Sequence, residues 1–408
     1  MSSNGTVEMD QELARRLLLE GAIFIFLDVP SGTEFGIDMK HWNTGEKFKG
    51  VKMIPPGIHY VHYSATNSQG DTGPRVGFIH NFQKSELVVK RWDKDAEDIS
   101  DKGMCSFLTS SVGKTAKIFI QISVLSECFI FPVVRYNIQV IQSLFQLKNQ
   151  TLTVQSTLVA DITCYPNPLA ENVVNAIIPT SGYIRSALEL LPCDTDRTSA
   201  GGAATTQSVK RRSRTAEEKE EDLLPQLKPS PGTELRFSQF PECNYPEGAT
   251  PAEITRHSLD SSYVLETLLS NYNSASDLIG ELQFAFVCFL VGHSLEAFEH
   301  WKKLVGTLCS CDSAVSKHRE LFYDTLTTLE TQLEEIPEDF LVDIVTSNNF
   351  IYHSLRELFR TLQESDTLDH RLKLRAKRLA ENLTARFGWD FTHLEEEDSD
   401  EAPVVVKT

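Results

Sequence analysis

The chain has 408 residues, with 57 Asp and Glu against 39 Lys and Arg, which gives a formal net charge of -18 at pH 7. Because a strongly acidic chain is repelled by phosphate backbones, this balance argues against broad nucleic-acid binding. Hydrophobic residues make up 41% and charged residues 24%, as in ordinary globular proteins, and the length leaves room for two or three domains.

Cysteine usage and the N-terminus indicate a reducing compartment. The 8 cysteines follow no regular framework, and the first residues are polar rather than an apolar signal region. Free thiols inside the cell are therefore expected. The most apolar stretch, residues 118–134, contains Glu127 and Pro132 and is short for a membrane span, so it is predicted to form buried strands.

The first hundred residues are predicted to be mainly β-structure. Residues 9–20 form the one expected helix of this part, with Asp10 as its cap. From residue 22 to 92, short runs rich in β-branched and aromatic residues alternate with turn sequences such as residues 55–57. Strands at this spacing predict an antiparallel sheet folded on itself as a sandwich or barrel.

Composition divides the chain into four parts. Residues 194–231 combine small residues, a basic cluster, an acidic run and prolines, and predict a flexible linker because they have little apolar surface to bury. The domains are then expected at 8–193, rich in β-structure but atypical over 99–193, and at 232–392, made of α-helices. Residues 393–408 are an acidic tail with a β-prone end.

Apolar residues recur with the helical period from about residue 250. Residues 250–253, TPAE, form a capping box with proline at the first helical position. Residues 280–292 are apolar nearly all round and predict the central helix, because a helix without a polar face is buried on every side. Further helices are predicted from Ser294 and over 311–335, 337–346, 350–364 and 367–387.

No nucleotide-binding, nucleophile-elbow or zinc-protease motif occurs in the sequence. A weak metal pattern consists of His293, His300, Cys309 and Cys311. Zinc ligands usually come in closer pairs with a second pair elsewhere, so core packing explains these side chains better. The glycine-rich turns at residues 70–77 are interpreted as corners of the sheet rather than a phosphate cradle, because no helix starts after them. No cofactor is expected.

Two basic clusters leave alternatives open. Residues 210–214, KRRSR, suit a nuclear import signal with Ser213 as a candidate phosphorylation site, or a solvated charge run. The basic face of the last helix suits an acidic partner or RNA, or solvation alone. Its residues are Arg371, Lys373, Arg375, Lys377 and Arg378.

The C-terminal end is a candidate partner-binding segment. Residues 395–401 are acidic and are predicted to extend into solvent. The triplet Val404, Val405 and Val406 follows a proline and prefers extended backbone. An apolar strand on an acidic tether suits addition to the edge of a partner's sheet, and a terminus without a role is the alternative.

Several long blocks of the chain form a specific pattern. The most specific is FKGVKMIPPGIHYVHYS at residues 48–64, and the second half adds YPEGATPAEITRHSLDSSY, GELQFAFVCFLVG, IPEDFLVDIV and FGWDF. In this order, the blocks resemble the Aar-two family of splicing factors. The resemblance covers roughly residues 8–98 and 229–408. Residues 99–200 depart from the family's pattern, so contacts that relatives make there are not transferred to this chain.

The resemblance implies a multidomain α+β protein, with an N-terminal antiparallel β-sandwich-like domain followed by an all-α domain similar to VHS domains. It implies a protein that is not an enzyme. Family members bind the central scaffold protein of the U5 small nuclear ribonucleoprotein at its RNase H-like and Jab/MPN-like domains, and hold off a spliceosomal helicase until nuclear maturation.

The role that the resemblance implies requires no direct nucleic-acid binding and no membrane, and places the protein in cytoplasm and nucleus. A VHS-like vesicle-cargo adaptor is the alternative. An enzyme that uses the glycine-rich loops of the β domain is a third interpretation.

Overall fold

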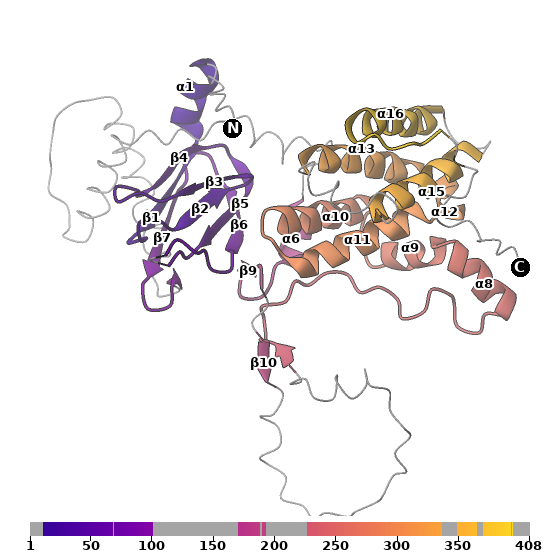
Figure 1. The fold of residues 1–408 in the computed structure, drawn as a ribbon, viewed down its shortest axis with the longest axis horizontal. Coiled ribbons are helices and arrows are strands. Elements are labelled where there is room, and N and C mark those ends of the chain that lie inside the picture. Colours follow the sequence, from indigo (N-terminus) through magenta and orange to yellow (C-terminus); the bar gives the residue numbers. More distant parts are fainter. Residues whose placement is uncertain are drawn as a thin grey trace, which may run out of the picture.

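The computed structural model describes residues 11–67, 69–100, 170–187, 190–192, 227–336, 349–364, 370–392 and 394. The described elements form a β-rich half and a helical half that lie side by side (Figure 1). The strands expected at 118–134 and the helix expected at 337–346 lie outside the described residues. Within those residues, no helix is both long and apolar enough to cross a membrane.

The β-rich half contains two sheets, with strand orders β4-β1-β7-β8 and β3-β2-β5-β6-β9. The bounds are β1 (Ala22–Leu27), β2 (Glu34–Ile37), β3 (Lys40–Asn43), β4 (Gly50–Ile54), β5 (Gly57–Ser64), β6 (Val76–Phe82), β7 (Leu87–Asp93), β8 (Asp98–Ile99) and β9 (Ile184–Arg185). The strands predicted between residues 22 and 92 are confirmed.

The prediction of an antiparallel sheet is confirmed only in part, because β1 and β7 pair in parallel, from Ile23 opposite Leu87 to Leu27 opposite Arg91, whereas the other described strand pairs of the two sheets are antiparallel. Parallel neighbours need a long crossover rather than a tight turn. Here β2, β3, β5 and β6 of the second sheet lie in the chain between β1 and β7 and are part of that crossover.

Aromatic side chains fill the space between the two sheets. Phe24 and Phe26 of β1 meet Phe35 of β2, each at a ring-centroid distance of 5.7 Å. Phe26 also meets Tyr63 of β5 at 5.9 Å and Trp92 of β7 at 5.9 Å. Each such aromatic pair adds roughly 0.5–1.5 kcal/mol beyond the burial of its surface. The predicted first helix is α1 (Gln11–Glu20), and it precedes β1 directly.

The helical half confirms the period seen after residue 250. Its helices are α8 (Pro251–Leu259), α9 (Ser262–Leu269), α10 (Ala275–Leu290), α11 (Leu295–Cys309), α12 (Ser313–Lys317), α13 (Arg319–Glu335), α15 (Phe350–Glu364) and α16 (His370–Phe387). The helix expected at 311–335 is two helices, because His318 leaves the helical conformation and its ring contacts Glu266 at 2.9 Å.

The helix starts predicted at Thr250 and Ser294 are confirmed by hydrogen bonds at their N-caps. Glu253 donates its backbone N–H to Thr250 Oγ1 at 3.4 Å, and Thr250 donates its N–H to the Glu253 carboxylate at 2.8 Å, which closes the capping box. Ser294 caps α11 by accepting from the backbone N–H of Ala297 at 3.3 Å. The central helix α10 begins earlier than predicted, at a second capping box of Ser274 and Asp277.

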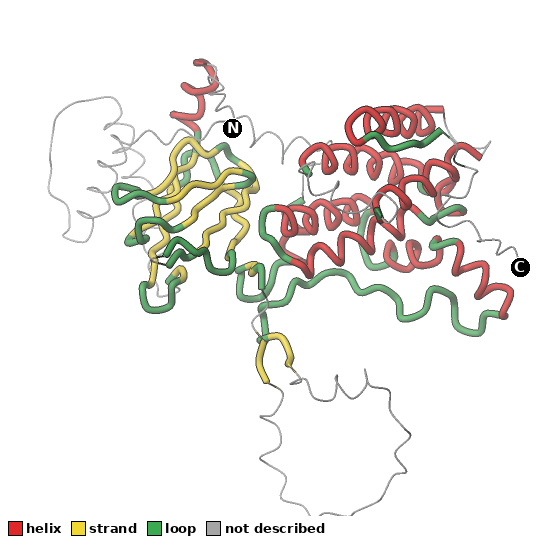
Figure 2. Tube along the Cα trace, in the orientation of Figure 1, coloured by secondary structure: helices red, strands yellow, loops and turns green. Residues whose placement is uncertain are grey.

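Helix α6 (Glu171–Ile177) and the two-stranded ribbon of β10 (Leu190–Pro192) and β11 (Leu227–Pro229) connect the halves. α6 packs on α10, where a Cβ added to Gly280 would meet Val173 at 3.3 Å. From β11 the chain crosses the helical half as an extended strap, residues 230–249, before α8 begins (Figure 2). The predicted domain boundaries stay predictions.

Candidate functional site

The two halves meet where the turn between α10 and α11 touches the second sheet. Arg75, next to β6, donates to the carbonyl oxygen of Val291 at 2.8 Å and forms an ion pair with Glu34 of β2. Its guanidinium also lies 3.0 Å from Nε2 of His293. The Arg75 and Glu34 side chains are only 11% and 16% exposed, so their attraction is screened less than that of a surface pair.

A tyrosine and a glycine complete this junction. Tyr60 of β5 is buried in the hydrophobic core of the helical half, and burial raises the pKa of its hydroxyl, which keeps it neutral. Gly292 lies against it, since a Cβ at that position would be 2.6 Å from the Tyr60 hydroxyl oxygen. A larger residue at 292 would therefore clash with the Tyr60 ring and also with the Cys288 carbonyl oxygen, which would be 2.5 Å from the added Cβ.

Inside the β-rich half, Asp38 and His59 have the geometry of a catalytic dyad, but the pair stabilises the turn after β2. Asp38 Oδ2 lies 2.7 Å from His59 Nδ1, and the other ring nitrogen is 2.9 Å from the carbonyl oxygen of Pro55. Asp38 Oδ1 accepts the backbone N–H of Tyr60 at 3.0 Å. Both ring nitrogens are thus engaged, and the pair fixes the turn after β2 instead of activating a nucleophile.

A buried carboxylate in α10 fastens the strap to the helices. Glu281 is 1% exposed. Its carboxylate accepts hydrogen bonds from the backbone N–H of Ser238 at 3.0 Å and from the Ser238 hydroxyl at 2.9 Å. It also meets the Tyr272 hydroxyl at 2.6 Å and His300 Nε2 at 2.6 Å. Burial alone would raise the pKa of Glu281, but the hydrogen bonds from His300 and Tyr272 outweigh it and lower the pKa. Phe237 of the strap stacks on the His300 ring at 4.1 Å.

The structure does not assemble the weak metal pattern. His300 belongs to the Glu281 cluster and His293 to the junction with Arg75. Cys309 and Cys311 are buried, and burial raises the pKa of both thiols, so they remain protonated. Across the described part of the chain, no group of three His, Cys, Asp or Glu residues is arranged to hold a metal ion.

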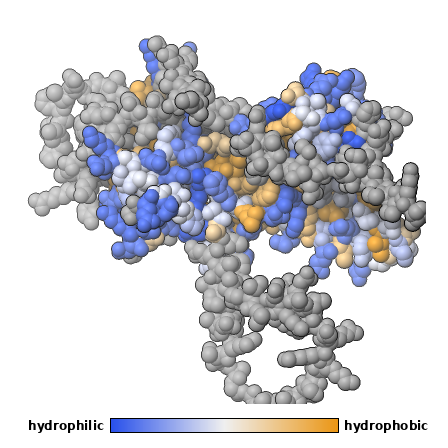
Figure 3. All heavy atoms as spheres, in the orientation of Figure 1, coloured by the Kyte–Doolittle hydropathy of each residue, from blue (hydrophilic) through white to orange (hydrophobic). Residues whose placement is uncertain are grey.

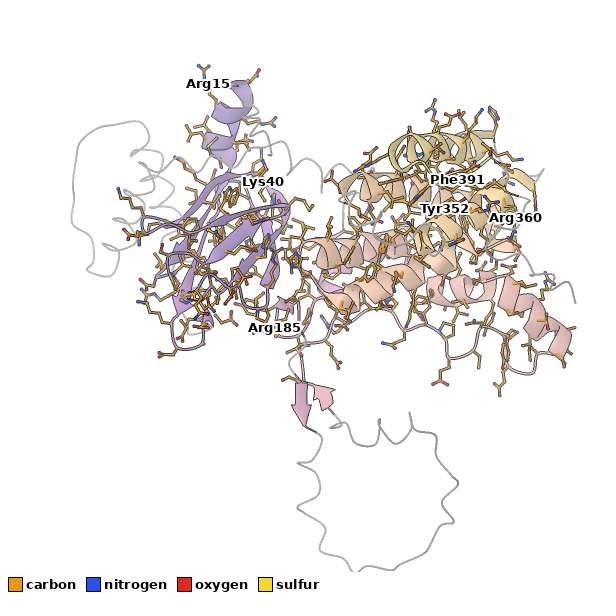
Figure 4. The ribbon with its side chains drawn as sticks, viewed as in Figure 1. Arg15, Lys40, Arg185, Tyr352, Arg360 and Phe391 are labelled. Carbon is orange, nitrogen blue, oxygen red and sulfur yellow. The ribbon has the colours of Figure 1, made fainter. Side chains whose placement is uncertain are left out.

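An apolar groove of about 630 Å³ lies between α15, α16 and the segment that follows α16; we call it the α15–α16 groove. Phe359, Leu362, Ala376, Ala380, Phe391 and Leu394 supply apolar walls, and Lys373 and Lys377 also line it. Phe391 packs on Phe359 at 5.0 Å, and the Tyr352 hydroxyl donates to the carbonyl oxygen of Asp390 at 2.8 Å. Figure 4 labels Tyr352 and Phe391 in this part of the helical half.

The basic residues of α16 divide between two sides of the helix. Arg375 forms an ion pair with Glu330 of α13, and the Arg371 guanidinium lies 4.0 Å from the Tyr323 ring. Lys373 and Lys377 line the α15–α16 groove instead. The predicted sites Ser213 and Val404–Val406 lie outside the described residues and stay predictions.

Apolar surface gathers at the ends of α10 and α11 that face the β-rich half (Figure 3). Leu295 at the start of α11 is 68% exposed. Sequence periodicity alone missed the Glu281 cluster and the junction, since their partners are 43 and 216 residues apart along the chain.

An N-terminal half of β-sheets joined to a C-terminal half of packed helices defines a two-part α+β protein. Residues 237–392 match the family described as AAR2 C-terminal repeat region, and residues 20–129 match the AAR2 N-terminal domain. The chain belongs to the AAR2 family. The second match also corrects the expectation that the N-terminal resemblance ends at residue 98.

Relatives from distant animals align with nearly the whole chain. It is 39% identical to Protein AAR2 homolog of Homo sapiens and 37% identical to that of Mus musculus, in each case over 98% of this chain and 97% of the relative. It is 31% identical to Protein AAR2 homolog of Caenorhabditis elegans, over 93% of this chain and 97% of the relative.

Proposed function

We propose that this chain is a non-enzymatic assembly factor in pre-mRNA splicing. It binds the central scaffold protein of the U5 particle at its RNase H-like and Jab/MPN-like domains, and holds off a spliceosomal helicase until nuclear maturation. The observation that carries the proposal is the relationship to AAR2 proteins, which extends over 98% of this chain.

A binding role rather than catalysis is supported by the state of the reactive groups. Both ring nitrogens of His59 form hydrogen bonds within the β-rich half, to Asp38 and to the Pro55 carbonyl oxygen. The thiols of Cys309 and Cys311 stay protonated in the core. We also infer a sandwich-like arrangement for the β-rich half, supported by the aromatic core that its two sheets share, and a VHS-like arrangement for the helical half. The chain acts first in the cytoplasm and then in the nucleus.

Copurification with a tagged chain tests the proposal. The scaffold protein of the U5 particle should be recovered from cytoplasmic extract without the helicase. Recovery of endosomal cargo receptors in place of the scaffold would assign the chain to the vesicle adaptors instead.

Deletion of residues 402–408 tests the tail as a contact. Binding to the RNase H-like and Jab/MPN-like domains together should weaken, chiefly through faster dissociation, because a paired strand is lost. The rest of the chain should stay folded, since the described core is complete at Leu394. Unchanged affinity for the two domains would remove the tail from the interface.

A further inference from the structure

The α15–α16 groove is lined by apolar and small side chains and opens next to the point where the chain continues into its tail. Ala376, Ala380 and Ala385 on α16 leave room above an aromatic wall made by Phe359 and Phe391. Leu394, the last described residue, is itself part of the lining. A groove of this size holds a few side chains of an extended segment.

Charge around the groove is complementary to the tail. Residues 395–401 read EEEDSDE. Lys373 and Lys377 line the groove, and Arg378 is exposed on the next position of α16. Glu381 is the one acid in the lining, and Lys377 Nζ lies 3.9 Å from it. The acidic residues of the tether and the lysines of the groove carry opposite charges, which attract each other.

Reach permits the contact. From Leu394 to Val404 the chain has about ten residues, which span at most ~35 Å when extended. The groove runs along α16 from Lys373 to Ala385, a rise of roughly 18 Å. The tether is therefore long enough to turn and lay the valine triplet in the groove.

We propose that the α15–α16 groove holds the chain's own C-terminal end, Val404–Val406, when no partner is bound. The inference rests on the proposed role of the tail: the groove shelters an apolar strand that is later given to the scaffold. A docked tail lowers the apparent affinity for the partner by the fraction of molecules in which the tail is free. The groove thus sets how readily the tail pairs with a partner's sheet.

Photo-crosslinking of the full chain tests the proposal without any partner. Lys407 is replaced by a photo-crosslinking amino acid, which leaves the three valines intact, and crosslinked peptides are mapped by mass spectrometry at low protein concentration. We expect crosslinks within one chain to residues 359–394. Ala380→Trp fills the groove and should lower their yield at least fivefold, and 0.5 M salt should lower it as well.

Leu374→Trp is the matched control, because it adds the same side chain to α16 at an exposed position outside the groove. It should leave the yield unchanged. If Ala380→Trp lowers the melting temperature, the double variant Lys373→Glu, Lys377→Glu replaces it and should also reduce crosslinking. Crosslinks between two chains, crosslinks spread over the surface, or a yield indifferent to both groove variants would overturn the proposal.

Binding to the scaffold domains separates this inference from the proposed function. If the tail is docked in nine molecules of ten, Ala380→Trp should bind them about tenfold more tightly. Crosslinks to the groove in a chain that binds no scaffold support the groove contact and refute the proposed function. Scaffold binding without groove crosslinks refutes the groove contact alone.

Discussion

At the scale of single residues, the carboxylate of Glu281 lies in the buried and mostly apolar stretch of helix α10. Four donor atoms surround it, from Ser238, Tyr272 and His300. A buried charge costs free energy unless it is fully hydrogen-bonded, so this cluster holds the strap in one position relative to α10 and α11.

Removing that carboxylate should destabilise the protein strongly. Glu281→Ala leaves the His300 and Tyr272 groups without their partner in a buried site, and we expect the free energy of unfolding in urea to fall by about 3–5 kcal/mol. Glu299→Ala is the control on α11, since the Glu299 side chain is 52% exposed and its pair with Lys302 contributes little. Equal stability of the two variants would show that the cluster does not hold the strap.

His62 should make the stability of the β-rich half depend on pH. Burial, and after it the nearby charges of Arg75, His41 and His293, lower the pKa of His62 from 6.5 to about 3. Its Nε2 forms a hydrogen bond with the carbonyl oxygen of Asp38 at 3.1 Å. Within the described residues, Nδ1 has no hydrogen-bond partner that could stabilise the protonated ring.

Below pH 6.5 the unfolded chain binds a proton at His62 that the folded chain does not, so the free energy of unfolding falls as the pH falls toward 3. This contribution is about 1.4 kcal/mol per pH unit at most. His62→Gln should show a shallower loss between pH 6 and 4, measured by urea unfolding. His80→Gln, at a half-exposed position of β6, should keep the original slope. Identical slopes for both variants would exclude His62 as the titrating group.

At the scale of elements, α10 carries the packing of the helical half. Its side chains are buried without interruption from Leu278 to Cys288, and Phe284 is fully buried. Phe284→Ala should lower the free energy of unfolding by about 3–5 kcal/mol, the range for removing a buried aromatic ring. Phe387→Ala, at a half-buried position of α16, should cost clearly less. A near-unchanged melting temperature for Phe284→Ala would show that α10 is peripheral.

The sequence predicted α10 from its apolar residues, and α15 with its observed bounds, because local periodicity determines both. It missed the start of α10 at Ser274, since the capping box there precedes the all-apolar run. The sequence analysis also included Glu281 in the stretch 280–292, which it described as apolar nearly all round, and predicted no role for this carboxylate. The partners of that carboxylate come from the strap and from α11, and no local pattern places them together.

At the scale of the whole molecule, contacts distant in sequence decide how the two halves are joined. The parallel pairing of β1 with β7 and the junction at Arg75 both escaped prediction from sequence for this reason. Alternation predicts that a strand exists and which face is buried, but not its neighbour in the sheet. The α15–α16 groove forms only when α15, α16 and the segment around Phe391 pack together. The sequence analysis therefore singled out its lysines but did not predict the groove.

Arg75 is the residue that should couple the halves. Arg75→Ala removes the donor to the Val291 carbonyl oxygen and leaves Glu34, only 16% exposed, without its cation. We expect a loss of about 1–3 kcal/mol, and thermal unfolding that separates into two transitions because the halves no longer stabilise each other. Small-angle scattering should show a larger radius of gyration.

Arg91→Ala is the control. Arg91 pairs with Asp28 at 3.1 Å in the same half, but the two side chains are 42% and 56% exposed and lie away from the junction. It should keep a single transition and the original radius. A single transition and an unchanged radius for Arg75→Ala would show that the apolar contacts around Tyr60 hold the halves together without this arginine.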